Sequence, residues 1–173
     1  RNKPTTYVSI EDGQSVTQIY AKQSRTCIVL NDNTASCWGF NENGQAGDDS
    51  TNRYKSPSAE VQFPDGKRVK SMGMVLKHTC AILEDDTLTC WGLDSHGALG
   101  NGNSDTSDKY TPQTITTPSD RKVVKVEPGA THTCILLEDG ACIVSPVSPL
   151  PSWPKLSRPQ HITPPSSRSI QVC

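Results

Sequence analysis

An internal repeat constrains the fold of this 173-residue chain more than any other feature of its sequence. Residues 16–47 align with residues 69–100 without a gap, at a period of 53 residues, and residues 123–142 form a third, shorter copy. In each full copy, two short apolar segments flank a polar turn, centred on Asp32 or Asp85. The pattern predicts one β-hairpin per copy, and a period near 50 residues is typical of β-propeller blades. The expected fold is therefore all-β, with blades of antiparallel strands.

The repeat also defines the expected domain organisation. Short extended segments follow Pro4, Pro57 and Pro112 and precede the three hairpins. Including them gives an incomplete propeller of about two and a half blades over residues 1–142. The repeats span about 4–56, 57–111 and 112–142. Because a blade buries its faces only against its neighbours, we expect the open blade edges to favour self-association.

The remaining residues, 143–173, differ in composition from the repeats. They contain seven prolines and seven serines in 31 residues. Repeated proline removes the hydrogen-bond donors that a sheet needs, so a disordered or polyproline-like tail is expected. A proline-rich ligand for an aromatic groove is the alternative. The abrupt end of the repeat favours a truncated or mis-spliced gene model. Because two and a half blades cannot close a propeller, the chain is expected to be a fragment.

Six of the seven cysteines form one pair in each repeat, and Cys173 is left over. A hairpin centred on Asp32 places Cys27 directly opposite Cys37, within reach of a disulfide. The expected disulfides are Cys27–Cys37, Cys80–Cys90 and Cys134–Cys142. The third pair has a spacing of eight residues instead of ten. Buried reduced thiols are the main alternative, and zinc is disfavoured because structural zinc sites use cysteines two to four residues apart.

Cysteine chemistry and charge restrict the compartment and the partners. Paired cysteines would indicate the extracellular space, the secretory lumen or the periplasm, whereas reduced ones would indicate the cytoplasm or nucleus. The chain has 17 Lys and Arg against 18 Asp and Glu, so we expect no direct contact with nucleic acid. Its apolar runs are only a few residues long, so no transmembrane span is expected.

Two segments, RTCIVLNDNTASCWGFNENGQAG at 25–47 and HTCAILEDDTLTCWGLDSHGALGNG at 78–102, resemble a known repeat. It is the repeat of the regulator of chromosome condensation family, in particular its cysteine-bearing, secreted branch. The resemblance implies a β-propeller that acts as a rigid scaffold for protein recognition, without catalytic residues. The matched structural positions are Trp38, Gly39, Gly44, Gly47, Trp91, Gly92, Gly97 and Gly100. The tryptophans would fill the space between blades, and the glycines would allow close backbone approach and positive φ.

The expected function is a non-enzymatic protein-interaction scaffold with a role in extracellular recognition and an unknown protein partner. The polar loops 47–56 and 100–111 differ most between the repeats and are the expected binding surface. Two alternatives remain open. One is guanine-nucleotide exchange on a small GTPase, as the namesake of the family performs, and the other is inhibition of an extracellular enzyme. The sequence lacks the common hydrolase, metalloprotease and phosphate-binding motifs, so no enzymatic activity, cofactor or metal is expected.

Overall fold

A computed structural model describes residues 8–55, 60–102, 107–117 and 121–145 of the chain. The tail expected over residues 143–173 lies outside the described residues, except for 143–145, which belong to the last strand. Among the described residues, no helix is long and apolar enough to cross a bilayer.

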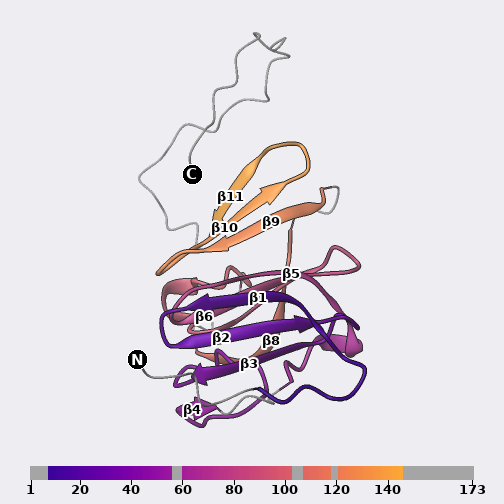
Figure 1. The fold of residues 1–173 in the computed structure, drawn as a ribbon. Helices are drawn as coiled ribbons and strands as arrows, with labels where there is room; N and C mark the ends of the chain where they lie inside the picture. Colours follow the sequence, from indigo (N-terminus) through magenta and orange to yellow (C-terminus); the bar gives the residue numbers. More distant parts are fainter. Residues whose placement is uncertain (1–7, 56–59, 103–106, 118–120, 146–173) are drawn as a thin grey trace, which may run out of the picture.

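The strands form three antiparallel sheets, and this confirms the predicted all-β fold (Figure 1). The first sheet has the order β1 (Val16–Lys22), β2 (Arg25–Leu30), β3 (Ala35–Phe40) and β4 (Tyr54–Lys55). The second has the order β5 (Val69–Met74), β6 (His78–Leu83), β7 (Leu88–Gly92) and β8 (Lys109–Ile115). The third contains β9 (Val123–Pro128), β10 (Thr133–Leu137) and β11 (Cys142–Ser145), with β10 in the middle. Two single-turn 3-10 helices are η1 (Pro64–Gly66) and η2 (Ser95–Gly97).

Short aspartate turns close the two hairpins of the full repeat copies. Between β2 and β3, the Asp32 carboxylate accepts hydrogen bonds from the N–H of Thr34 at 3.0 Å and from its hydroxyl at 2.7 Å. Between β6 and β7, the Asp85 carboxylate accepts a hydrogen bond from the N–H of Thr87 at 3.1 Å. An aspartate that bonds the backbone two residues later stabilises a turn locally. The turn residues therefore help to set the register of each hairpin.

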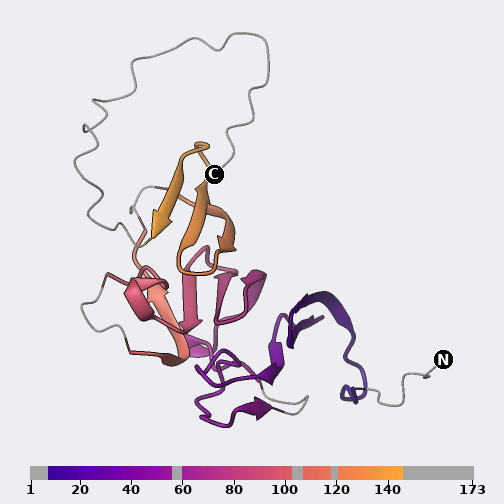
Figure 2. The ribbon, with the colours of Figure 1, turned by 90° about the vertical axis from the view of Figure 1, so that its left-hand side faces the viewer.

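The three sheets are arranged as successive blades (Figures 1 and 2). Strand β5 contacts both β1 and β9, so the first strand of each sheet lies on the side where the blades converge. One hydrophobic core lies between the first and second sheets, and another lies between the second and third. The described residues therefore form an arc of an incomplete propeller, in which each internal interface is a sheet-to-sheet contact.

The sheets are offset from the sequence repeat. Pro112 lies in β8, the outermost strand of the second sheet, although the repeat places it at the start of the third copy. In the first sheet, the N–H of Val61 donates to the carbonyl of Ala35 at 2.8 Å, so this segment also pairs with the preceding sheet. Proline lacks an N–H and is tolerated mainly on edge strands. The extended segment that opens one repeat thus completes the outer edge of the sheet before it.

Candidate interaction surface

Each sheet has two different faces, which we call the cysteine face and the tryptophan face. The cysteine face carries Cys27 in the first sheet and Cys80 in the second, and the tryptophan face lies on the opposite side. Cys27 shares a hydrophobic core with Met72 and Trp91 of the second sheet. Cys80 shares the other core with Val126 of the third sheet. Both internal interfaces therefore join the cysteine face of one sheet to the tryptophan face of the next.

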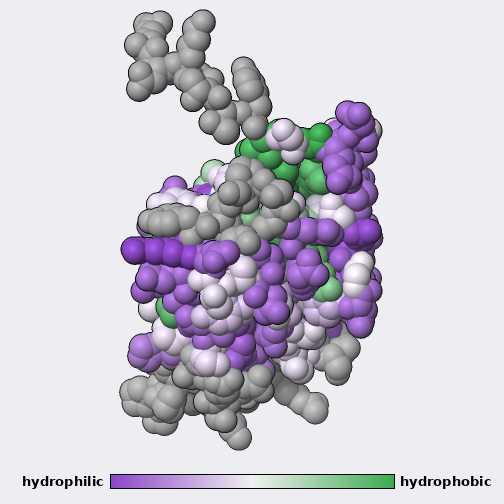
Figure 3. Space-filling view, turned by 90° about the horizontal axis from the view of Figure 1, so that it is seen from below, coloured by the Kyte–Doolittle hydropathy of each residue, from purple (hydrophilic) through white to green (hydrophobic). Residues whose placement is uncertain are grey.

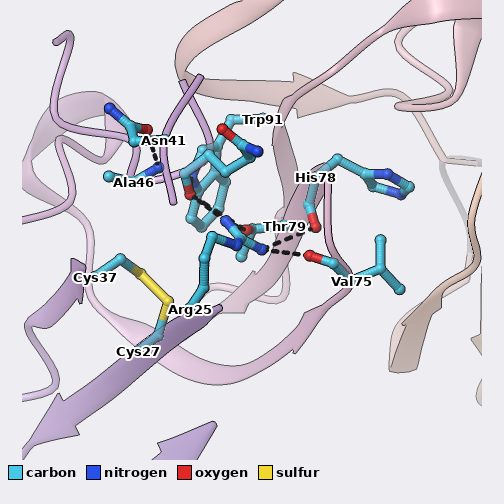
Figure 4. The surroundings of a disulfide bond; sticks show 10 residues. Arg25, Cys27, Cys37, Asn41, Ala46, Val75, His78, Thr79 and Trp91 are labelled. Carbon is cyan, nitrogen blue, oxygen red and sulfur yellow. Dashed lines mark hydrogen bonds between the residues drawn. A yellow bond between two sulfur atoms is a disulfide. The ribbon is translucent and has the colours of Figure 1, made fainter. Parts of the chain in front are cut away.

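The structure contains two of the expected disulfides. Cys27 lies opposite Cys37 in the β2–β3 pairing, with their Cα atoms 4.1 Å apart (Figure 4). Cys80 lies opposite Cys90 in the β6–β7 pairing, with their Cα atoms 4.0 Å apart. Each bond crosses one hairpin, so it stabilises the blade in which it lies.

The expected Cys134–Cys142 disulfide is wrong. Cys134 is a free, half-buried thiol that pairs in register with Val144, whereas Cys142 pairs with Leu136. The turn after Leu137 has the same length as the turns of the other hairpins. The shorter spacing between the two cysteines therefore does not shorten the turn. It moves Cys142 two positions along β11, away from the residue opposite Cys134.

The two matched tryptophans differ in their surroundings. Trp91 is fully buried and packs against Phe63 in a T-shaped arrangement, with 5.8 Å between the ring centroids. Its indole N–H donates to the carbonyl of Gln45 at 2.9 Å. Trp38 is only half-buried, because none of the described sheets covers the tryptophan face of the first sheet. The role expected for these residues, to fill the space between blades, is thus performed by Trp91 between the first two sheets.

The matched glycines all have positive φ, and at two of them the atom nearest to an added Cβ is a backbone carbonyl oxygen. At Gly39 (φ 99°), an added Cβ would lie 2.2 Å from the carbonyl oxygen of Ser24, and at Gly92 (φ 105°) it would lie 2.4 Å from that of Lys77. A side chain at either position would collide with the neighbouring strand end. The remaining matched glycines have φ between 71° and 76° and are Gly44, Gly47, Gly97 and Gly100.

A buried arginine connects the first two sheets (Figure 4). Arg25 is 3% exposed, and its guanidinium donates to the Thr79 hydroxyl at 2.9 Å and to the carbonyls of Val75 at 2.6 Å and His78 at 3.4 Å. It also donates to the carbonyl of Gln45 in its own blade at 2.8 Å. Burial lowers the pKa of Arg25 to about 10, so the group stays charged at neutral pH. These acceptors replace the water that the cation loses on burial.

The residue one repeat after Arg25 makes an equivalent contact between the second and third sheets. His78 follows Arg25 by one repeat, and its imidazole points away from Arg25 (Figure 4). Its Nε2 lies 3.1 Å from the hydroxyl of Thr133, which donates to the carbonyl of Ala98 at 2.9 Å. Thr133 is the equivalent of Thr79. We call this arrangement, Arg25 with Thr79 and His78 with Thr133, the inter-sheet lock.

Protonation of His78 is expected to destabilise the fold between pH 6.5 and 4. Burial, and then the charges of Arg25 and His132, lower its pKa from 6.5 to about 4. Because the folded-state pKa is below the unfolded-state value, the unfolded chain binds more protons in this window. The contribution of neutral His78 is therefore complete above pH 6.5 and is lost as the pH falls towards 4. The full shift corresponds to roughly 3 kcal/mol.

The measurement is the free energy of urea unfolding across this pH window, for the wild type and for His78→Gln. The variant has no side chain at position 78 that titrates between pH 6.5 and 4, so the pH dependence of its unfolding free energy in this window should be flatter. Hydrogen bonds from Thr34 lower the pKa of Asp32, and hydrogen bonds from the Thr87 side chain and from Lys67 lower that of Asp85. Both proteins should therefore lose stability at lower pH. Equal slopes for the two proteins above pH 4 would contradict the role given to His78.

The polar loops 47–56 and 100–111 begin with the same anchored turn. The side-chain oxygen of Asn41 accepts a hydrogen bond from the N–H of Ala46 at 2.7 Å, and one repeat later Asp94 accepts one from Leu99 at 3.1 Å. Beyond these turns, the N–H of Asp49 donates to the carbonyl of Tyr110 at 3.1 Å. Residues 56 and 103–106 lie outside the described part of the chain. The structure thus brings the two loops together at one end of the first two sheets.

A groove of about 560 Å³ opens at this same end of the sheets. Its apolar lining comes from Val75 and Leu76 in the β5–β6 turn and from Leu93 after β7. Lys22 of the first sheet and Ala130 of the third also line it, so turns from all three sheets contribute. Sequence reasoning missed this groove. The available signal was the apolar pair Val75-Leu76 in a tight turn, where polar residues are usual.

The ionisable side chains that line the groove are all basic. Lys22, Lys77 and His96 are exposed side chains of its lining, and no described carboxylate lines it. An apolar floor with a cationic rim suits a ligand that offers apolar and acidic groups together. On the face drawn in Figure 3, by contrast, hydrophilic side chains predominate and hydrophobic ones gather near one edge. Among the described residues, no three His, Cys, Asp or Glu side chains are placed to hold a metal ion.

Together, these features define a β-propeller repeat protein. Its sheets are joined by the inter-sheet lock, and disulfides cross-link two of its hairpins. A family model described as the regulator of chromosome condensation (RCC1) repeat matches residues 85–136. A second model with the same description matches residues 16–45 and 69–98. The chain belongs to the RCC1 repeat family, as its sequence motifs suggested.

The known relatives that match this chain are much longer than it. The ultraviolet-B receptor UVR8 of Arabidopsis thaliana is 32% identical over 129 residues, which make up 75% of this chain and 29% of the receptor. The crystal structure of human WBSCR16 matches with a TM-score of 0.69 and 20% identity over 78% of this chain and 34% of its own. The crystal structure of Prp20p from Saccharomyces cerevisiae, described with its binding to Gsp1p and histones, matches with a TM-score of 0.62 and 17% identity. The match covers 75% of this chain and 32% of Prp20p. These structural similarities support the fold alone, and the chain spans about a third of each relative.

Proposed function

We propose that this chain is a non-enzymatic protein-recognition scaffold. The observation that carries the proposal is the groove described above, where turns from three sheets create one apolar surface with a cationic rim. The buried locks and disulfides hold these turns in fixed relative positions, so little ordering is required on binding. An extended protein segment with apolar and acidic side chains is the ligand class that fits this chemistry.

We also propose that the protein is located in an oxidising compartment, and that its role is extracellular. Two cysteine pairs lie directly opposite each other in neighbouring strands, and such pairs persist as disulfides where the surroundings are oxidising. Peptide mapping by mass spectrometry, after thiols are trapped in the intact cells that produce the protein, tests this. Linked Cys27–Cys37 and Cys80–Cys90 peptides are expected. Free thiols at these positions would place the chain in a reducing compartment.

The recognition proposal is tested by selection of displayed random peptides on the purified chain. Enriched peptides are expected to combine acidic with apolar residues. Lys77→Glu reverses a charge at the rim of the groove and should weaken the binding of the selected peptides about tenfold. Lys67→Glu is the matched control, because Lys67 pairs with Asp85 at 3.0 Å at the opposite end of the second sheet. Equal effects of the two reversals, or no enrichment, would refute the groove as the recognition site.

The two alternatives predict other results. Nucleotide exchange would appear as faster release of bound guanine nucleotide from a small GTPase, for which Gsp1p is a suitable probe, and it requires a reducing compartment. Inhibition of an extracellular enzyme would appear as a stoichiometric loss of that enzyme's activity. Exchange by a chain with free thiols would replace the present proposal. Inhibition that Lys77→Glu abolishes would identify the enzyme as the partner of the groove.

A further inference from the structure

The turn between β5 and β6, which forms much of the apolar floor of the groove, is held by side chains of the preceding blade. Val75 and Leu76 of this turn are half-buried and line the groove. The carbonyl of Val75 accepts a hydrogen bond from the guanidinium of Arg25 in β2 at 2.6 Å (Figure 4). The carbonyl of Leu76 accepts one at 3.2 Å from the side-chain amide of Gln45, which lies between β3 and β4. The backbone of this turn is therefore fixed from outside its own hairpin.

Gln45 is itself held in place by several hydrogen bonds. It is fully buried, and its side-chain oxygen accepts a hydrogen bond from the N–H of Asn43 at 2.8 Å. Its backbone carbonyl accepts hydrogen bonds from the guanidinium of Arg25 at 2.8 Å and from the indole of Trp91 at 2.9 Å. A buried amide with both of its polar ends bonded has little freedom to reorient. It therefore donates to the carbonyl of Leu76 from a fixed position.

The equivalent turn of the third sheet, between β9 and β10, is not held in this way. Its residues Ala130 and Thr131 also line the groove, and both are exposed. Ala98 occupies the position of Gln45 one repeat later and has no side-chain amide to donate. Among the described residues, no donor of the second sheet bonds the carbonyl of Ala130. The groove therefore has a fixed wall on the second sheet and an adaptable wall on the third.

We propose, resting on the recognition role proposed above, that Gln45 is a positioning residue and that the groove selects an apolar side chain only at the turn it holds. An extended ligand places this apolar anchor against Val75 and Leu76, where the surface is preformed and little ordering is needed on binding. Its acidic residues face the exposed Lys22 and Lys77. The turn of the third sheet accepts residues of several kinds, because its backbone adjusts to each of them.

Hydrogen exchange of the free chain, measured by NMR, tests whether Gln45 holds the turn. The N–H of Val75 donates to the carbonyl of His78 at 3.0 Å, and one repeat later the N–H of Gly129 donates to that of His132 at 2.7 Å. Gln45→Met keeps a side chain of similar size without the amide. It should speed exchange at Val75 about tenfold and leave exchange at Gly129 unchanged. Unchanged exchange at Val75 would overturn the positioning role without the use of any ligand.

The affinities of the selected peptides test the role of Gln45 in selection. Replacement of a peptide's apolar anchor by alanine should weaken binding to the wild type about tenfold, but binding to Gln45→Met by less than about threefold. Replacement of an acidic peptide residue should weaken binding to both proteins equally, because the rim charges are the same. A general loss of stability would not change the first difference, since both proteins are folded. Equal losses on anchor replacement would overturn the selectivity of the turn and leave the proposed function standing.

Two control variants separate positioning from stability. Gln62→Met removes an exposed amide that donates to the carbonyl of Glu60 at 3.3 Å, and it should behave like the wild type in both measurements. Val69→Ala weakens the core between the first two sheets at the far end of β5, so it should lower stability but keep the wild-type preference for the apolar anchor. Loss of that preference in Val69→Ala would overturn the role of Gln45. Failure of the wild type to enrich any peptide would instead refute the proposed function, and the selectivity with it.

Discussion

Reduction of the Cys27–Cys37 and Cys80–Cys90 disulfides is expected to abolish cooperative folding of the isolated chain. Each disulfide joins residues 10 apart in sequence, and closing such a loop contributes roughly 3 kcal/mol in the chain-entropy model. Two bonds together contribute on the order of 6 kcal/mol, which is comparable to the total stability of many small domains. The measurement is urea unfolding, followed by circular dichroism, with and without a thiol reductant.

The free cysteine provides the control for this prediction. Cys134→Ala removes a thiol that forms no disulfide, so its midpoint of unfolding without reductant should stay close to that of the wild type. The double variant Cys27→Ala, Cys37→Ala should show about half of the destabilisation that reduction of these two disulfides causes, because the second hairpin keeps its bond. Unfolding curves that superimpose with and without reductant would show that the disulfides do not stabilise the fold.

Replacement of Arg25 by alanine is expected to destabilise the chain by about 3 kcal/mol. The substitution removes four hydrogen bonds of a buried cation and leaves the carbonyls of Val75 and His78 without this donor. Because Arg25 joins the first two sheets, we also expect the single unfolding transition to broaden as the sheets uncouple. Urea unfolding monitored by Trp fluorescence reports this loss, since Trp91 lies buried at the same interface.

Arg68→Ala is the matched control for this substitution. Arg68 is exposed and lies 3.9 Å from Glu60, so its removal should cost less than about 0.5 kcal/mol. Arg25→Lys tests the geometry of the lock, because an ammonium group keeps the charge but cannot form the planar fork of the guanidinium. We expect it to recover only part of the lost stability. Equal effects of Arg25→Ala and Arg68→Ala would show that the buried lock is dispensable.

Short-range patterns in the sequence predicted the blades well. The alternation around Cys27 and Cys80, together with the aspartate turns, placed two hairpins in their observed register, and the disulfides followed from that register. The same reasoning failed for Cys134, because it assumed that the two cysteines of a pair always mark opposite positions. The turn length, which the sequence also contains, was the better guide to which residues pair.

The sequence by itself determined the strands, the hairpin turns and the repetition of one structural unit, because these depend on neighbours within about ten residues. Only the tertiary structure decided which faces meet, and therefore which residues matter at the interfaces. Nothing local distinguishes buried Arg25 from exposed Arg68. The apolar pair Val75-Leu76 is unusual in a turn, but it does not tell which residues of the other sheets, such as Lys22, line the groove with it. Those roles arise when sheets stack and bring together residues about one repeat apart, so that burial and hydrogen bonding are set by contacts between blades.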